Sequence, residues 1–108
     1  MVQEIKSNEE FKTALSDAGD KLVVVDFFAD WCGPCRTIAP TVEEMSKGEF
    51  SDCVFLKVNV DNESCQEICK ENKISCMPTF IVFKGGQVKD RLEGASAEKL
   101  KDMIKKNK

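Results

Sequence analysis

The segment that most limits how this chain can fold is Leu22 to Phe28, with the sequence LVVVDFF. It is apolar at nearly every position and rich in β-branched residues, which is typical of a strand buried on both faces. A second segment, Val54 to Val60, has the same character. Two such strands predict a sheet whose two faces are both covered by other parts of the chain.

Amphipathic helices alternate with these strands. Ser7 and Glu10 have the spacing of a capping box, and a helical pattern of apolar residues follows up to Gly19. A second helix carries Pro40 inside its pattern, where a kink is expected. Asn62 is placed to cap a short third helix. A fourth helix is predicted from apolar residues at helical spacing near the end of the chain: Leu100, Met103 and Ile104.

Two further strands are expected at Thr79 to Phe83 and Gln87 to Leu92, joined by the hairpin signal Lys84-Gly85-Gly86. The segment Val2 to Ile5 is compatible with a short additional strand. Alternation that ends in a hairpin predicts an α/β fold in which helices flank both faces of a central mixed β-sheet, a three-layer α/β/α arrangement. A length of 108 residues is that of one domain, so we expect a single domain over residues 1–108.

The composition narrows the range of partners. The formal net charge is -3, so the chain lacks the basic field that binding to nucleic acid requires. No run approaches the roughly 20 apolar residues of a membrane span, and the first residues lack the apolar segment of a secretory signal. We therefore expect neither a nucleic acid nor a membrane as partner, and we expect a cytoplasmic location.

Six cysteines in a chain without a secretory signal predict free thiols, which persist as catalytic groups, metal ligands or core residues. Two of them lie in the motif Trp31-Cys32-Gly33-Pro34-Cys35, between a buried strand and a helix. Cys32 is then expected at the helix N-terminus, where free N–H groups and the helix dipole stabilise a thiolate. Pro34 suits the first helical turn and, with Gly33, holds the thiols together. The motif predicts a nucleophile, Cys32, and a less exposed resolving thiol, Cys35.

A Cys-x-x-Cys pair is also half of a zinc site. Because the chain has no histidine, the other two ligands would come from Cys65 and Cys69, or from Cys76. A metal knuckle requires neither the tryptophan nor the proline of the motif, whereas a catalytic site uses both. The motif therefore favours redox chemistry without a bound metal.

Asp26 is a carboxyl group inside an otherwise apolar strand. Burial disfavours the charged form, so its pKa is expected to rise toward neutrality. Because its strand leads within a few residues to the cysteines, we expect Asp26 to accept the proton of Cys35, directly or through water. The alternative is a structural acid paired with Lys57 in the other buried strand. The two interpretations are compatible, because such a pair would tune the same proton.

Three stretches of this sequence resemble the thioredoxins, and those of the animal cytosolic type in particular: KLVVVDFFADWCGPC, CMPTFIVFKGG and the glycine in LEGAS. The resemblance extends over essentially the whole chain. It implies a thioredoxin fold and a general protein disulfide reductase with no bound cofactor. It also implies re-reduction by an NADPH-dependent thioredoxin reductase, and targets such as peroxiredoxins.

The resemblance also implies a substrate site. Pro78 falls where the family has a cis proline beside the dithiol, and the backbone of Met77 would pair with an extended segment of the substrate. Core packing is the alternative for the tryptophan, although its place beside Cys32 favours the surface. The residues expected to line a shallow apolar groove are Trp31, Met77, Pro78, Gly94 and Ala95.

The other cysteines lie outside the Cys-x-x-Cys motif. Cys76 matches a position at which animal thioredoxins often carry a surface cysteine linked to oxidative dimerisation, so we expect a monomer that forms an oxidative dimer through Cys76. Cys65 also matches an extra-cysteine position of that group. Cys65 and Cys69 lie one helical turn apart on the predicted buried face, which is compatible with small core residues or with a regulatory pair.

A second class of function competes with the reductase. The same groove could recognise partner proteins, with the redox state of Cys32 and Cys35 gating the interaction. Two intact cysteines argue against a purely non-catalytic version of this binding module.

Overall fold

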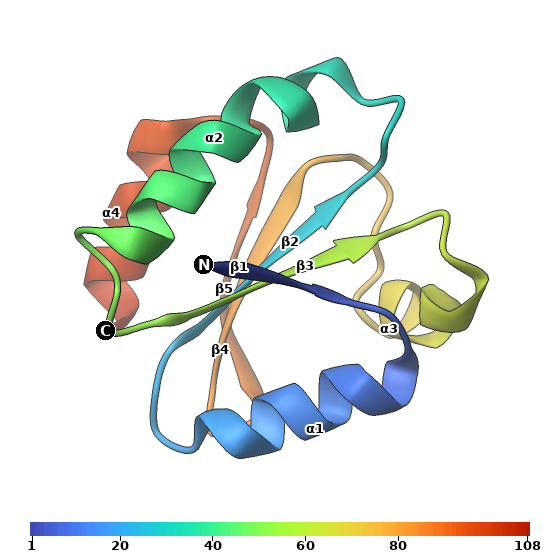
Figure 1. The fold of residues 1–108 in the computed structure, drawn as a ribbon, viewed down its shortest axis with the longest axis horizontal. Coiled ribbons are helices and arrows are strands. Elements are labelled where there is room, and N and C mark those ends of the chain that lie inside the picture. Colours follow the sequence, from blue (N-terminus) through green and yellow to red (C-terminus); the bar gives the residue numbers. More distant parts are fainter.

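A five-stranded mixed sheet, ordered β1-β3-β2-β4-β5, forms the centre of the computed structural model, which describes residues 1–108 (Figure 1). The first three strands run parallel to one another, whereas β4 runs antiparallel to β2 and β5 antiparallel to β4. The strands are β1 (Val2–Ile5), β2 (Val23–Phe28), β3 (Val54–Asn59), β4 (Thr79–Lys84) and β5 (Gln87–Glu93).

Four helices cover the sheet, with α1 and α3 on one face and α2 and α4 on the other (Figure 1). The helices are α1 (Asn8–Ala18), α2 (Gly33–Lys47), α3 (Gln66–Glu71) and α4 (Ala97–Asn107), and a 3-10 turn, η1 (Glu63–Cys65), precedes α3. The expected three-layer α/β/α arrangement with a central mixed sheet is confirmed. None of the helices combines the length and the hydropathy that a membrane crossing needs.

The central strand β2 divides its side chains between the two apolar layers. Val23, Val25 and Phe27 pack on the side of α1 and α3, whereas Val24 packs on the side of α2 and α4. Because side chains alternate along a strand, Asp26 shares the α2 side with Val24. The alternation of side chains along β2 therefore directs the carboxyl group of Asp26 toward α2, the helix at whose start the dithiol lies.

Local chemistry explains where the helices begin. The hydroxyl of Ser7 accepts a hydrogen bond from the N–H of Glu10 at 3.1 Å, so α1 starts at the expected cap. Pro40 lies inside α2, which nevertheless continues to Lys47. The short helix after Asn62 differs from the expectation, because a 3-10 turn comes first and Cys65 lies in that turn rather than in α3. A single turn of 3-10 helix is common at such a start.

Candidate active site

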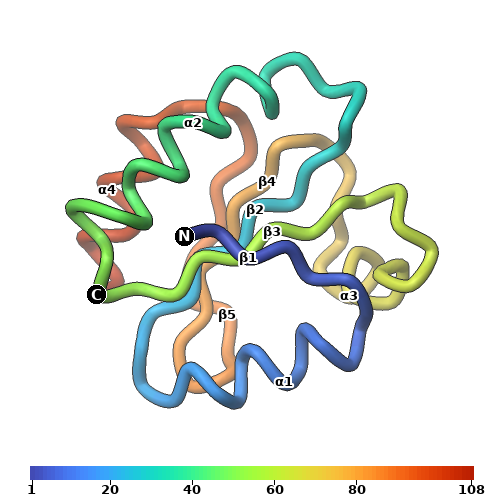
Figure 2. Tube along the Cα trace, viewed as in Figure 1, coloured from blue at the N-terminus to red at the C-terminus, as the bar shows by residue number.

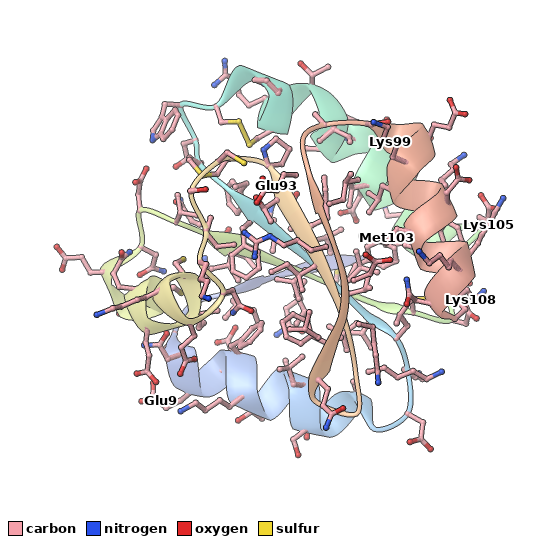
Figure 3. All side chains as sticks on the ribbon, turned by 180° about the vertical axis from the view of Figure 1, so that it is seen from behind. Glu9, Glu93, Lys99, Met103, Lys105 and Lys108 are labelled. Atoms are coloured by element: carbon pink, nitrogen blue, oxygen red, sulfur yellow. A yellow bond between two sulfur atoms is a disulfide. The ribbon has the colours of Figure 1, made fainter.

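The dithiol lies where β2 ends and α2 begins. A disulfide joins Cys32 and Cys35, whose Cα atoms are 5.3 Å apart (Figure 3). Both residues are buried, with 5% and 4% of their surfaces exposed, so the expected contrast between an exposed and a hidden cysteine is absent in this oxidised state. The pair closes a small ring at the first turn of the helix, with Gly33 and Pro34 between the two sulfur atoms.

The first turn of α2 is arranged to hold charge on one sulfur atom. Cys32 occupies the N-cap position, and the N–H of Cys35 donates to Cys32 Sγ across 3.1 Å. In the reduced protein the same N–H, together with the positive end of the helix, favours a thiolate at Cys32. Pro34 has no N–H of its own, so it adds no unsatisfied donor to this turn. The geometry suits Cys32 as the attacking sulfur.

The backbone of Met77 lies against the dithiol. The Met77–Pro78 peptide bond is cis, and the carbonyl oxygen of Met77 is 3.6 Å from Cys32 Sγ. The N–H of Gly94 donates to the carbonyl of Pro78 at 2.9 Å, so the end of β5 is tied to the same loop. Gly94 has a φ of 113°, a conformation that favours glycine. Figure 2 shows the chain passing from α3 to β4 beside the end of β2, which brings this loop to the cysteines.

Trp31 lies on the surface and not in the core. Its side chain is 66% exposed, and its indole Nε1 donates to a carboxylate oxygen of Asp61 at 2.9 Å. Gly94 and Ala95 are exposed as well. Of the other expected groove residues, Met77 is half-buried and Pro78 is buried, so Trp31, Gly94 and Ala95 are the ones that present exposed surface. Asp61 was not among the expected site residues, because no local pattern connects two side chains that are 30 residues apart.

Asp26 is a buried acid with an unsatisfied oxygen. It is 6% exposed, and its Oδ1 has no hydrogen-bond partner. Burial raises the pKa of Asp26 from 3.8 to about 7, and the positive charge of Lys57 opposes that rise. The two residues are direct neighbours in the β2–β3 register, yet they form no ion pair, and the Lys57 ammonium lies 5.5 Å from the ring centroid of Phe28. The charge of Lys57 therefore lowers the pKa of Asp26 without an ion pair between the two side chains.

A cavity of about 150 Å³ connects this acid to the dithiol. Its walls include Asp26, Cys35, Lys57 and Arg36, whose Nη1 donates to the carbonyl of Asp30 at 2.7 Å. The cavity is lined by both charged and apolar side chains, and its volume is enough for a water molecule. Because Asp26 and Cys35 both line this cavity, a water molecule in it would offer a path for a proton between them.

The remaining cysteines are free and differ in exposure. Cys65 and Cys69 are buried in the apolar layer below α1, and burial raises the pKa of both thiols. Cys53 is half-buried, and burial raises the pKa of its thiol as well. Cys76 is exposed, directly before the Met77–Pro78 bond. No three His, Cys, Asp or Glu side chains gather in a way that could hold a metal ion, so the ligands that a zinc site would need do not come together.

A disulfide at the start of a helix, a cis proline beside it and a buried acid behind it, all on a mixed sheet, define a dithiol–disulfide oxidoreductase. A model of the family described as Thioredoxin matches residues 2–106. The chain is 50% identical over 105 residues to the thioredoxin of Equus caballus, a match that covers 97% of each chain. The chain therefore belongs to the thioredoxin family and resembles its animal members, as the sequence motifs predicted.

Solved structures agree with this assignment. The thioredoxin of Fasciola hepatica superposes with a TM-score of 0.92 at 38% identity, covering 98% of this chain and 99% of that one. A thioredoxin f2 in complex with a ferredoxin:thioredoxin reductase superposes with a TM-score of 0.91 at 36% identity, covering 98% and 94%. The fold and the redox-active disulfide are thus those of a thiol–disulfide oxidoreductase.

Proposed function

We propose that this protein reduces disulfides in other proteins and is itself re-reduced by an NADPH-dependent thioredoxin reductase. The observation that carries the proposal is the position of Cys32 Sγ, which lies 3.1 Å from the Cys35 N–H and 3.6 Å from the Met77 carbonyl. One contact activates the sulfur, and the other places it beside a backbone that an extended substrate segment can pair with.

The reaction begins with the reduced protein. The Cys32 thiolate attacks one sulfur of the target disulfide, the target S–S bond breaks, and a mixed disulfide forms while the other target sulfur leaves as a thiolate. Cys35 then loses its proton through the cavity to Asp26 and attacks Cys32 Sγ. The second target sulfur leaves, so two electrons have passed to the target. The product is the Cys32–Cys35 disulfide seen in the structure.

Substrate recognition uses the surface around the dithiol. The Met77 backbone would pair with an extended segment of the target, and exposed residues would contact apolar side chains: Trp31, Gly94 and Ala95. Pro78 is buried and would hold the Met77 backbone in place. Backbone pairing and a flexible methionine impose little sequence preference. This suits an enzyme with many protein targets, among which we include peroxiredoxins.

The likeness to a thioredoxin that binds a reductase supports the reductase as a partner, and that structure concerns a ferredoxin-dependent enzyme. We propose an NADPH-dependent reductase here because the chain resembles animal thioredoxins. We also propose that the protein acts in the cytoplasm. Four free cysteines, two of them buried in the core, are typical of a reducing compartment.

The assay is the reduction of insulin disulfides with NADPH and thioredoxin reductase. We expect the wild-type protein to support reduction and Cys32→Ser to abolish it. Cys53→Ser is the matched control, because this free thiol is not part of the site and should leave the rate unchanged. A Cys32–Cys35 couple that proves strongly oxidising against glutathione would overturn the assignment as a reductase.

A redox-gated binding module is the second candidate, and the exposed Trp31 beside the disulfide favours it. The Cys32–Cys35 disulfide forms at the first turn of α2 next to this side chain, so partner affinity would follow the redox state. A partner that remains bound to the double variant Cys32→Ala and Cys35→Ala, measured by calorimetry, would support this function. Loss of all binding in the double variant would leave the disulfide exchange as the basis of the interaction.

A further inference from the structure

The loop from Asn72 to Pro78 has no regular secondary structure, although it carries the backbone that faces the dithiol. Lys73 has a positive φ of 53°, which is uncommon for a residue with a side chain. Neither a helix nor a strand ladder determines the path of this loop. Contacts with the rest of the molecule must therefore set the position of Met77.

The edge strand β5 holds the loop at both ends. At the far end, the N–H of Gly94 donates to the carbonyl of Pro78. At the near end, the guanidinium of Arg91 donates through Nη1 to the carbonyl of Asn72 and through Nη2 to the carbonyl of Lys73, the latter at 2.9 Å. The first of these ties joins two backbones. The second depends on a single side chain.

Arg91 is oriented for this task by its neighbour on the strand. Glu93, labelled in Figure 3, accepts hydrogen bonds from Arg91 Nε at 3.2 Å and from Nη2 at 3.1 Å. The guanidinium then presents its remaining N–H groups to the two carbonyls, which is a use of the planar fork that a lysine cannot reproduce. The side chain is 32% exposed, so it is partly shielded from water.

The two carbonyls need this partner. Asn72 and Lys73 follow the last residue of α3, and carbonyls at a helix end have no partner within the helix. The other backbone hydrogen bonds of the segment run back to its own helix, such as the bond from Ile74 N–H to the Cys69 carbonyl at 3.0 Å. Arg91 is thus a direct link between the start of the loop and the sheet. Hydrogen bonds from a charged donor are stronger than those from a neutral one.

We infer that Arg91 is a positioning residue for protein substrates, acting through the 72–78 loop that presents the Met77 backbone to an extended target segment. This inference rests on the proposed reduction of protein disulfides. A small disulfide meets Cys32 Sγ without pairing with the Met77 backbone. Arg91 therefore sets the affinity for polypeptide disulfides and not the reactivity of the dithiol itself.

The test compares Arg91→Met and Arg91→Lys with Lys89→Met. Lys89 is exposed on the same strand and forms no ion pair or side-chain hydrogen bond, so its variant controls for lost positive charge on β5. Each protein is assayed with insulin and with 5,5′-dithiobis(2-nitrobenzoic acid) as a small disulfide. We expect Arg91→Met to raise the KM for insulin about five- to tenfold with a small change in kcat. Arg91→Lys should lie between this variant and wild type.

Reduction of the small disulfide should stay within about twofold of wild type in every variant. An unchanged KM for insulin in Arg91→Met would overturn the inference, and so would an equal loss with both substrates. If Arg91→Met does not fold, Arg91→Lys decides by the same two rates. Hydrogen exchange at the Ile74 amide should be about tenfold faster in the variants, and unchanged exchange would contradict the anchoring role.

The same assays distinguish a failure of the proposed function from a failure of the role assigned to Arg91. If wild type and Lys89→Met also fail to reduce insulin, the protein is not a reductase of polypeptide disulfides. If both reduce insulin and the Arg91 variants match them, the function stands and the role of Arg91 is wrong.

Discussion

At the scale of single residues, the site depends on how burial changes the chemistry of ordinary side chains. Asp26 is the clearest case, since an acid with an unsatisfied oxygen costs free energy in an apolar layer. The same burial raises the pKa of Asp26 to about 7, which lets it take up and release a proton near neutral pH. The burial of Asp26 thus lowers the stability of the folded protein, at a position where proton transfer is useful.

The pH dependence of the free energy of unfolding should reveal how much stability the burial of Asp26 costs. Because the pKa of Asp26 is higher in the folded than in the unfolded state, the native state binds more protons between about pH 4 and pH 7, and stability falls as pH rises through that window. The loss is on the order of 4 kcal/mol by pH 8 and is absent in Asp26→Asn. Urea denaturation of the oxidised proteins at pH 4 and pH 8 measures the difference.

Asp20→Asn is the matched control for that experiment, because Asp20 is an exposed carboxyl in the turn before β2. Its stability relative to wild type should be the same at both pH values. If the gap between Asp26→Asn and wild type also stays constant from pH 4 to pH 8, the carboxyl titrates normally and the raised pKa of Asp26 is wrong.

The same residue should control the second chemical step. Without its carboxyl, Asp26→Asn cannot accept the Cys35 proton, so we expect release of the mixed disulfide to slow about a hundredfold. Rapid-quench measurements from pH 6 to pH 9 should lose the inflection near the pKa of Asp26, about 7, in this variant. Formation of the mixed disulfide should change far less, and an equal slowing of both steps would place Asp26 outside the proton path.

At the scale of elements, helix starts carry both stability and chemistry. At α1 the cap is an ordinary serine hydroxyl, whereas at α2 the cap is the sulfur of Cys32. Both satisfy an N–H three residues further on, Glu10 in one case and Cys35 in the other. The second helix thus uses a capping position as an active site, and the first offers a comparison in which only stability is at stake.

Removal of the α1 cap should therefore affect stability alone. Ser7→Ala loses the bond to the Glu10 N–H, and we expect the free energy of unfolding to fall by about 1 kcal/mol. Insulin reduction should be unchanged at a temperature where the variant is folded. Ser51→Ala, in an exposed turn, is the control and should be neutral in both assays. A stability loss equal to that of the control would mean that the Ser7 cap contributes nothing.

At the scale of the whole molecule, the distribution of free thiols limits how two copies can be linked. Two lie in the core and one is half-buried, while Cys76 is exposed and lies in the 72–78 loop. A disulfide between two copies through Cys76 would bring two active-site faces together. Such a dimer would cover the surface that we propose for substrate binding, so oxidation would switch off reduction.

Oxidised wild-type protein should run as a dimer on a non-reducing gel, and Cys76→Ser should abolish that band. Cys53→Ser serves as control, since its half-buried thiol has a raised pKa and should be a poor partner for exchange. Insulin reduction by the purified dimer should be lost and recovered on addition of a dithiol. An undiminished dimer in Cys76→Ser would assign the link to another cysteine.

Local patterns were enough for much of the fold and for half of the site. Strand burial, capping residues and the hairpin glycines depend on near neighbours in the chain, so the sheet, the helices and the dithiol at the start of α2 followed from them. Met77, Pro78 and Gly94 followed only from resemblance, because no pattern of spacing brings them to Cys32. The position of Cys65 in a 3-10 turn was missed, since boundaries of short helices are weakly encoded.

The sequence by itself determined which residues could do redox chemistry and on which kind of element each would lie. Only the tertiary structure decided which side chains from distant parts of the chain meet: the indole of Trp31 with Asp61, and the guanidinium of Arg91 with the loop after α3. The physical reason is distance along the chain. A hydrogen bond or a shared cavity between residues far apart in sequence depends on how whole elements pack, and packing is a property of the assembled core.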